Sequence, residues 1–208
     1  EETRKHCIML ENVCYGETEL MVLNMIRYGL FGDLLHGEAA YIHDLRKSLF
    51  SDHYEENWRI KHAFHRDGNF YPTHGLGPVA QCMNINRGDR FDYLTSMSSP
   101  SLGLAQYAAE HLDPVHPLFH QKFKAGDMNT SFIKTARGRT IMIQHDTTSP
   151  RPYSRINLIQ GTRGTFRGFN DRIFIEGRNT GHQWDNLNGY KEEFTHPLWK
   201  KVGAEARK

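Results

Sequence analysis

The feature that most constrains the fold is a pair of alternating segments in the second half of the chain. Residues 130–136 and 140–147 alternate apolar and polar side chains, and Arg-Gly-Arg at residues 137–139 separates them. Period-two alternation on both sides of a short turn predicts a β-hairpin. Residues 156–160 and 172–175 predict two further strands. Strands in hairpin order build an antiparallel sheet, and because the helices are concentrated earlier in the chain, the expected class is α+β.

The first half of the chain predicts helices and strands in alternation. Glu17 and Glu19 suit the N-terminus of a helix, and Gly29 and Gly32 suit its C-terminal end. The other expected elements are a buried strand over residues 7–10, a strand over 34–42, a helix over 74–85, a strand over 91–97, a helix over 102–111, and a terminal helix or docked aromatic from Pro197. Residues 44–70 read as a long irregular connection, and long connections are often functional.

Composition excludes several classes of function. The chain has 208 residues, 38% of them hydrophobic, and a net charge of +2 with scattered basic residues, so no nucleic-acid-binding stripe is expected. No apolar run approaches the roughly 18 residues that span a membrane. Residues 1–5 precede no apolar stretch of a signal peptide, so the chain reads as cytoplasmic, or as a mature or truncated chain.

Cysteines and histidines give no sign of a metal site. Cys7, Cys14 and Cys82 lack metal-ligand spacing and stand among apolar residues, so we expect buried, inert thiols. The 13 histidines are scattered, and no His-Glu-x-x-His motif occurs. The sequence therefore predicts no bound metal.

The run Tyr-Pro-Thr-His-Gly-Leu-Gly-Pro at residues 71–78 points most directly to chemistry. Tyr71 and His74 can carry protons, and the two glycines would let a ligand approach the backbone closely. Such a run fills a core poorly and lines a polar pocket well. The alternative is an ordinary turn followed by a helix with Thr73 as its N-cap.

Residues 75–80 also match the G-x-G-x-x-A pattern of dinucleotide-binding loops, with Asp92 downstream. A genuine fingerprint follows a buried strand in a β-α-β unit. Residues 68–72 do not form such a strand, because Pro72 cannot donate to a sheet ladder. We interpret the match as chance and expect no Rossmann nucleotide loop in this chain.

Longer motifs across the chain resemble a known enzyme family. Residues 10–12 and 29–34 are similar to the junction that follows the Rossmann domain in the Gfo/Idh/MocA oxidoreductases. Within that superfamily, further runs resemble glycoside hydrolase family 109, the NAD-dependent α-N-acetylgalactosaminidases. These runs are residues 11–16, 41–46, 58–59, 68–78, 83–90 and 150–155. They are long and follow one another in order over most of the chain.

The resemblance implies a large, predominantly antiparallel open β-sheet with helices on one face. It implies that residues 1–15 hold a remnant of the last strand of a nucleotide-binding Rossmann domain, which is otherwise absent from this chain. Residues 16–208 would then form a substrate-binding and oligomerisation domain. It further implies a bacterial protein that is exported or periplasmic at full length, and a homo-oligomer formed through the open sheet.

The resemblance also implies NAD as cofactor, used without net redox change. In the family, sugar C3 is oxidised by hydride transfer to NAD, the acidified C2 proton leaves to a base, and the aglycone departs from C1. Water then adds and the hydride returns, so the protein supplies orientation and proton transfer. His74 is the favoured acid–base group, because a histidine titrates near neutrality, and Tyr71 is the second catalytic residue.

Further site residues carry over by their place in the matching motifs. The expected NAD contacts are Asn12, Trp58 and Tyr71. The expected contacts to a terminal α-N-acetylgalactosamine are Tyr41, Arg59, Tyr71, Pro72, Thr73, His74 and Tyr153. Tyrosines offer a sugar both an aromatic face and a hydroxyl. Taken singly, Tyr41 also fits a strand aromatic, Trp58 a loop anchor and Arg59 a surface ion-pair partner.

Two other functions stay open. The chain also fits an NAD(P)-dependent sugar oxidoreductase with net redox change, or a non-catalytic oligomerisation fragment. Ile133, Ile141 and Ile143 share one parity of the hairpin, and Phe132 and Met142 share the other. Both faces of the hairpin are therefore partly apolar, as expected of a sheet buried in a subunit interface.

Overall fold

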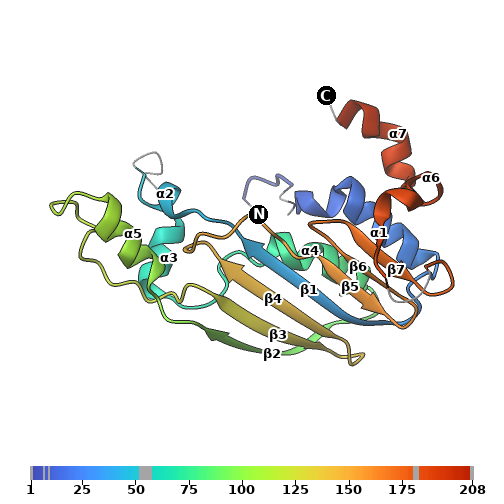
Figure 1. Cartoon of the computed structure of the whole chain (residues 1–208), viewed down its shortest axis with the longest axis horizontal. Coiled ribbons are helices and arrows are strands. Elements are labelled where there is room, and N and C mark those ends of the chain that lie inside the picture. The colour runs from blue at the N-terminus through green and yellow to red at the C-terminus, as the bar shows by residue number, and fades with distance from the viewer. Residues whose placement is uncertain (1, 7, 9, 52–57, 180–182, 207–208) are drawn as a thin grey trace.

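The protein is built on a single sheet of eight strands in the order β2-β3-β4-β1-β5-β6-β7-β8 (Figure 1). The computed structural model describes residues 2–6, 8, 10–51, 58–179 and 183–206. The strands are β1 (Leu34–Ile42), β2 (Phe91–Ser98), β3 (Asn129–Thr135), β4 (Thr140–Asp146), β5 (Leu158–Gly161), β6 (Gly164–Arg167), β7 (Arg172–Ile175) and β8 (Asp185–Asn186). Neighbouring strands run antiparallel except the central pair β1 and β4. The predicted open, predominantly antiparallel sheet is confirmed.

Among the described residues, helices cover one face of this sheet (Figure 1). They are η1 (Asn12–Tyr15), α1 (Glu17–Arg27), α2 (Arg46–Leu49), α3 (Trp58–His65), α4 (Thr73–Cys82), α5 (Gly103–His111), η2 (Leu187–Tyr190), α6 (Lys191–Phe194) and α7 (Pro197–Ala206). Helices α1, α4 and α6 lie over the sheet, and α2, α3 and α5 gather at one end of it. The indole N–H of Trp199 donates to the carbonyl oxygen of Tyr15 at 3.0 Å, which ties α7 to η1.

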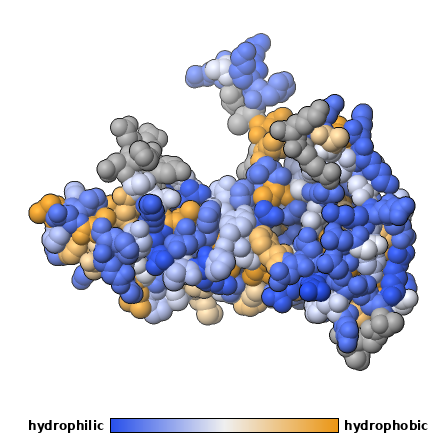
Figure 2. Space-filling view, turned by 45° about the horizontal axis from the view of Figure 1, so that its top comes forward, coloured by the Kyte–Doolittle hydropathy of each residue, from blue (hydrophilic) through white to orange (hydrophobic). Residues whose placement is uncertain are grey.

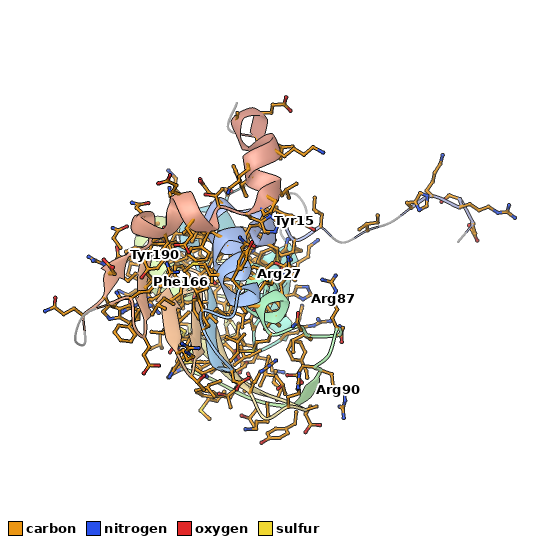
Figure 3. All side chains as sticks on the ribbon, turned by 90° about the vertical axis from the view of Figure 1, so that its right-hand side faces the viewer. Tyr15, Arg27, Arg87, Arg90, Phe166 and Tyr190 are labelled. Atoms are coloured by element: carbon orange, nitrogen blue, oxygen red, sulfur yellow. The ribbon has the colours of Figure 1, made fainter. Side chains whose placement is uncertain are left out.

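The core lies between the sheet and the helices. Its inward-facing strand residues, all at most 5% exposed, are Ile133, Ile141, Ile143, Ile159, Phe166 and Ile173. Figure 3 labels Phe166 on the sheet side and Tyr190 on the helix side, and both belong to this core. The strand residues of opposite parity lie on the face of the sheet that the helices do not cover. Phe132 on this face is 50% exposed. The alternation of the hairpin therefore separates a packed face from an open one.

The glycines of the 71–78 run serve packing between elements. A Cβ on Gly75 would lie 2.5 Å from the backbone nitrogen of Ala40, and one on Gly77 would lie 2.8 Å from Cγ of Glu11. Helix α4 therefore sits directly on β1 and η1, and the expected close approach is to the protein's own backbone. Residues 66–72 before α4 contain no strand, which confirms that the glycine pattern is not a dinucleotide fingerprint.

Several sequence predictions need correction. Residues 44–70 contain α2 and α3, so describing this stretch as irregular was wrong; its residues 52–57 lie outside the described part. The expected strand over residues 7–10 is not seen at Ile8 and Leu10, which are exposed, while Cys7 and Met9 lie outside the described residues. Strand β6 was missed, because only pairing with β5 and β7 defines it.

The two thiols that the structure describes are buried, as the sequence predicts. Cys14 and Cys82 are buried, and burial raises the pKa of their thiols to about 11 and about 12, so both stay protonated. Within the described ranges, no helix has the length and apolar character to cross a bilayer, and no group of three His, Cys, Asp or Glu side chains could hold a metal. Figure 2 shows that most of the surface in this view is hydrophilic.

Candidate active site

The candidate site lies where β1 and β4 end, beside the first turn of α4. Tyr41 is the last but one residue of β1, and its register partner on β4 is His145. Because β1 and β4 are parallel, their carboxyl ends meet at the same edge of the sheet. Helix α4 begins at Thr73 with Pro72 at the N-cap position, so Thr73 is not the N-cap that the alternative interpretation of this run assumed.

Tyr41 is the centre of an aromatic cluster. The centroid of its ring lies 4.9 Å from that of Tyr71, 5.7 Å from that of His74 and 6.3 Å from that of Tyr153, each in edge-to-face geometry. The rings of Tyr71 and His74 lie 4.8 Å apart. The structure thus brings together four of the residues that the motifs assigned to a sugar site. Aromatic faces bordered by polar tips are well matched to a sugar ring.

Arg59 reaches this cluster from α3. Its Cζ lies 4.4 Å from the ring centroid of Trp58 and 5.2 Å from that of Tyr71. Burial raises the pKa of Tyr41 above its usual value, and the charge of Arg59 offsets part of that rise. Nε of Arg59 is buried without a hydrogen-bond partner among the described residues.

Glu11 is one of the residues at this site to which the sequence analysis assigned no role. Its Oε1 lies 2.8 Å from Nδ1 of His74, and both side chains are largely buried. A carboxylate on Nδ1 fixes the orientation of the imidazole and leaves Nε2 for proton transfer. The one signal for Glu11 is its place at the head of the motif at residues 11–16, next to Asn12.

Two further histidines border Tyr41 without having been assigned a role. Nδ1 of His43 lies 3.3 Å from the Tyr41 hydroxyl, and its ring lies 5.1 Å from that of Tyr153. His145 is 5% exposed and stacks on Tyr41 with 6.2 Å between ring centroids. Burial, together with the charge of Arg59, lowers the pKa of His145 to about 4, so its imidazole is neutral at neutral pH.

The remaining predicted site residues lie around the cluster. The ring of Trp58 is 6.1 Å from that of Tyr71 and is partly exposed at the rim. Asn12 is exposed at the start of η1, beside Glu11. Pro72 and Thr73 line a different hollow of about 430 Å³, which we call the α4 groove. The α4 groove is lined by Glu11, Cys14, Tyr15, Pro72, Thr73, Leu76, Gly77, Ala80, Gln81, Ile85, Asn86, Arg87 and Phe91.

The α4 groove has a charged end at the turn between α4 and β2. Arg87 lines the groove, and Figure 3 shows Arg87 and Arg90 pointing outward from this turn. Asn84 and Asn86 in the same turn have φ values of 56° and 63°, in the left-handed region that asparagine tolerates. Because Glu11 both lines this groove and pairs with His74, the groove and the aromatic cluster adjoin each other.

Solved structures of similar fold are oxidoreductases. Levoglucosan dehydrogenase in complex with NADH matches with a TM-score of 0.58 and 16% sequence identity, over 88% of this chain and 48% of that one. An NAD binding oxidoreductase from Klebsiella pneumoniae matches with a TM-score of 0.59 and 16% identity, over 85% of this chain and 44% of that one. The likeness shows the fold of the Gfo/Idh/MocA C-terminal domain.

Sequence relatives are much closer. Glycosyl hydrolase family 109 protein 2 of Shewanella sp. strain ANA-3 is 59% identical over 210 residues, which cover 99% of this chain and 46% of that protein. A family 109 protein of Shewanella baltica strain OS155 is 58% identical over 211 residues, with the same coverage. The chain therefore spans about half the length of the curated relatives it matches. The family model described as glycosyl hydrolase 109, C-terminal domain, matches residues 15–208, and the chain belongs to this family.

Proposed function

We propose that this chain is the substrate domain of an NAD-dependent glycosidase that hydrolyses terminal α-N-acetylgalactosamine. The observation that supports it most is the convergence of Tyr41, Tyr71, His74 and Tyr153 on one surface, with Glu11 on Nδ1 of the histidine. Tyrosine rings and hydroxyls provide sugar contacts, and a carboxylate-held imidazole provides a proton carrier. Membership of family 109 favours glycoside hydrolysis as the use of this arrangement.

Only one end of an NAD molecule fits the described residues. Trp58 and Tyr71 offer partly exposed aromatic rings, and Asn12 offers an exposed amide beside Glu11, which suits the nicotinamide end. A pyrophosphate instead needs glycines that let it approach free N–H groups at a helix N-terminus. The space beside the glycines of α4 is occupied by β1 and η1. We therefore assign the pyrophosphate site to a separate nucleotide domain, which residues 1–15 would join to residues 16–208.

The chain's own residues would handle the protons of the reaction. NAD, when bound, supplies reversible hydride acceptance at sugar C3, which acidifies the proton at C2. Glu11 holds Nδ1 of His74, so Nε2 is the atom that removes the C2 proton as a base and returns it as an acid. Tyr71, in edge contact with His74, serves as the second proton-transfer group.

Other residues of the cluster would bind and orient the sugar. Burial keeps Tyr41 protonated, so its hydroxyl can donate, and the guanidinium of Arg59 beside the ring of Tyr71 would contact the sugar. Tyr153 borders the cluster next to Tyr41 and Trp58 borders it next to Tyr71, and both would limit access of water to the sugar ring. Pro72 and Thr73 would contact the part of the substrate or cofactor that enters the α4 groove.

The open face of the sheet is our candidate for contact between copies. Tyr93 and Met97 on β2 and Phe132 on β3 are all exposed and share this face. Apolar side chains gathered on one uncovered face are typical of a surface that associates. This contact would form a homo-oligomer and leave the helix side, with the α4 groove, free.

The reaction is tested on the full-length protein with NAD and an aryl α-N-acetylgalactosaminide in deuterium oxide. Release of the aglycone, one deuterium at C2 of the free sugar and no accumulated NADH are the expected results. Stoichiometric NADH without aglycone release would instead identify a sugar oxidoreductase. Release of the aglycone without deuterium at C2 would exclude His74 as the base in this scheme.

A further inference from the structure

The segment that carries Tyr153 is fixed beside the end of β1. Ser154 and Ile42 exchange two backbone hydrogen bonds of 3.0 Å each, and the N–H of Ala40 donates to the carbonyl oxygen of Arg155 at 2.8 Å. This pairing places Tyr153 next to Tyr41 from the neighbouring segment. The side chain of Tyr153 is nevertheless 41% exposed, so the backbone alone does not set the direction of its hydroxyl.

Arg155 links this hydroxyl to a buried carboxylate. Its Nη1 lies 3.4 Å from the hydroxyl oxygen of Tyr153, and its Nη2 donates to Oε1 of Glu19 at 2.6 Å. The guanidinium also lies 5.3 Å from the ring centroid of Phe169. The side chain of Glu19 is only 7% exposed, so the ion pair is poorly screened and holds the guanidinium in place. A donor held in this way fixes the phenol oxygen and leaves the phenol proton to be donated elsewhere.

The position of Glu19 depends on a glycine. Glu19 lies in the first turn of α1, where the helix dipole favours a carboxylate. A Cβ on Gly16 would lie 2.1 Å from Oε2 of Glu19, so any side chain at residue 16 would displace this carboxylate. Gly16 and Arg155 stand in two different motifs of the sequence, at residues 11–16 and 150–155, and Glu19 connects them.

The backbone after Arg155 is strained. Ile156 has φ 60° and Asn157 has φ 53°, in the left-handed region that a β-branched residue such as isoleucine rarely adopts. Such a conformation persists only where surrounding contacts hold it, and it occurs often at functional sites. The ion pair of Arg155 with Glu19 ties this segment to α1, while backbone hydrogen bonds hold it against β1.

We propose that Arg155, anchored by Glu19, is a positioning residue that directs the hydroxyl of Tyr153 toward the bound sugar. The inference rests on the proposed function for its ligand, since Tyr153 is assigned there to sugar binding. Its geometric basis is the chain of contacts from Glu19 through Arg155 to Tyr153. Arg155 itself does not need to touch the substrate.

The test compares Arg155→Lys, Tyr153→Phe and the double variant in the full-length protein. Arg155→Lys keeps the positive charge but has one donor nitrogen in place of the two that contact Tyr153 and Glu19, so we expect a loss of about tenfold in kcat/KM, mainly through KM. In the Tyr153→Phe background the same change should cost nothing further, because the hydroxyl it acts through is gone. An equal loss in both backgrounds overturns the proposal. Arg178→Lys is the matched control, because its pair with Glu193 is exposed.

A second readout needs no substrate. In protein labelled with fluorotyrosine, the fluorine resonance of Tyr153, assigned by its loss in Tyr153→Phe, should move in Arg155→Lys and in Glu19→Gln but not in Arg178→Lys. An unmoved resonance in both site variants overturns the positioning role, provided that thermal unfolding shows them folded. A moved resonance in a protein that hydrolyses no sugar supports the positioning role and refutes only the proposed reaction.

Discussion

Glu11 and His74 lie 63 positions apart in the sequence, yet Oε1 of Glu11 is 2.8 Å from Nδ1 of His74. The pair joins η1 to the first turn of α4. Glu11 lines the α4 groove, whereas His74 meets the rings of Tyr41 and Tyr71. Glu11 therefore orients the imidazole of His74 from the side of the α4 groove. The proton transfer assigned to His74 would take place on the side of the aromatic cluster.

Replacing His74 by alanine in the full-length protein should reduce turnover of an aryl α-N-acetylgalactosaminide by roughly 10²-fold or more, the usual loss for a general acid–base group. KM should change less, because the lost interaction matters chiefly in the transition state. Glu11→Gln should lower kcat by about tenfold, since an amide can keep the hydrogen bond but not the charge. Tyr71→Phe should also impair turnover while keeping the ring. Steady-state kinetics of the variants check these expectations.

Glu110→Gln serves as the control for these variants, because Glu110 is exposed on α5. It should leave both kinetic constants unchanged. If His74→Ala lowers the melting temperature while kcat stays near the wild-type value, His74 only packs the first turn of α4. That result would remove the assignment of the catalytic base.

The chain by itself should not bind NAD tightly. The glycines of α4 contact Ala40 and Glu11, so they offer a pyrophosphate no open backbone. Isothermal titration of the isolated chain with NAD should therefore show no micromolar affinity, whereas the full-length protein should bind. Micromolar binding by the isolated chain would contradict the assignment of the pyrophosphate site to a separate domain.

The sequence predicts the elements whose signal is local. Strand β1 was expected over residues 34–42 and is found as Leu34–Ile42, and the hairpin of β3 and β4 follows its period-two pattern. Helix α3 was missed because only Ile60 and Ala63 in it are buried, against a small separate cluster. A histidine-rich helix with so narrow an apolar stripe gives little periodic signal.

The residues of the site could be predicted only where they stand in a sequence motif. Tyr41, Tyr71, His74 and Tyr153 stand in long motifs, and the structure brings them together. The place of His145 depends on the parallel register of β1 and β4, which no local pattern specifies.

The open face of the sheet should mediate self-association. Phe132 is 50% exposed on this face, so Phe132→Glu would place a charge inside the expected contact and should lower the oligomer mass measured by light scattering. Val115→Glu is the matched control, because Val115 is 87% exposed but lies outside the sheet. A wild-type protein that remains monomeric at tens of micromolar would contradict this prediction.

Stability should fall on mild acidification because of His145. Burial lowers its pKa in the folded protein to about 4, from an ordinary value near 6.5. Between these values the unfolded chain binds the extra proton, so stability is fully present above about pH 6.5 and is lost as the pH falls toward 4. At pH 5 the titration of His145 alone should lower the free energy of unfolding by about 2 kcal/mol relative to pH 7. Urea unfolding at pH 5 and pH 7 measures this difference in the free energy of unfolding. The difference should shrink by about 2 kcal/mol in His145→Gln. It should persist in His111→Gln, because His111 is exposed. An undiminished difference in His145→Gln would show that other groups set the acid sensitivity.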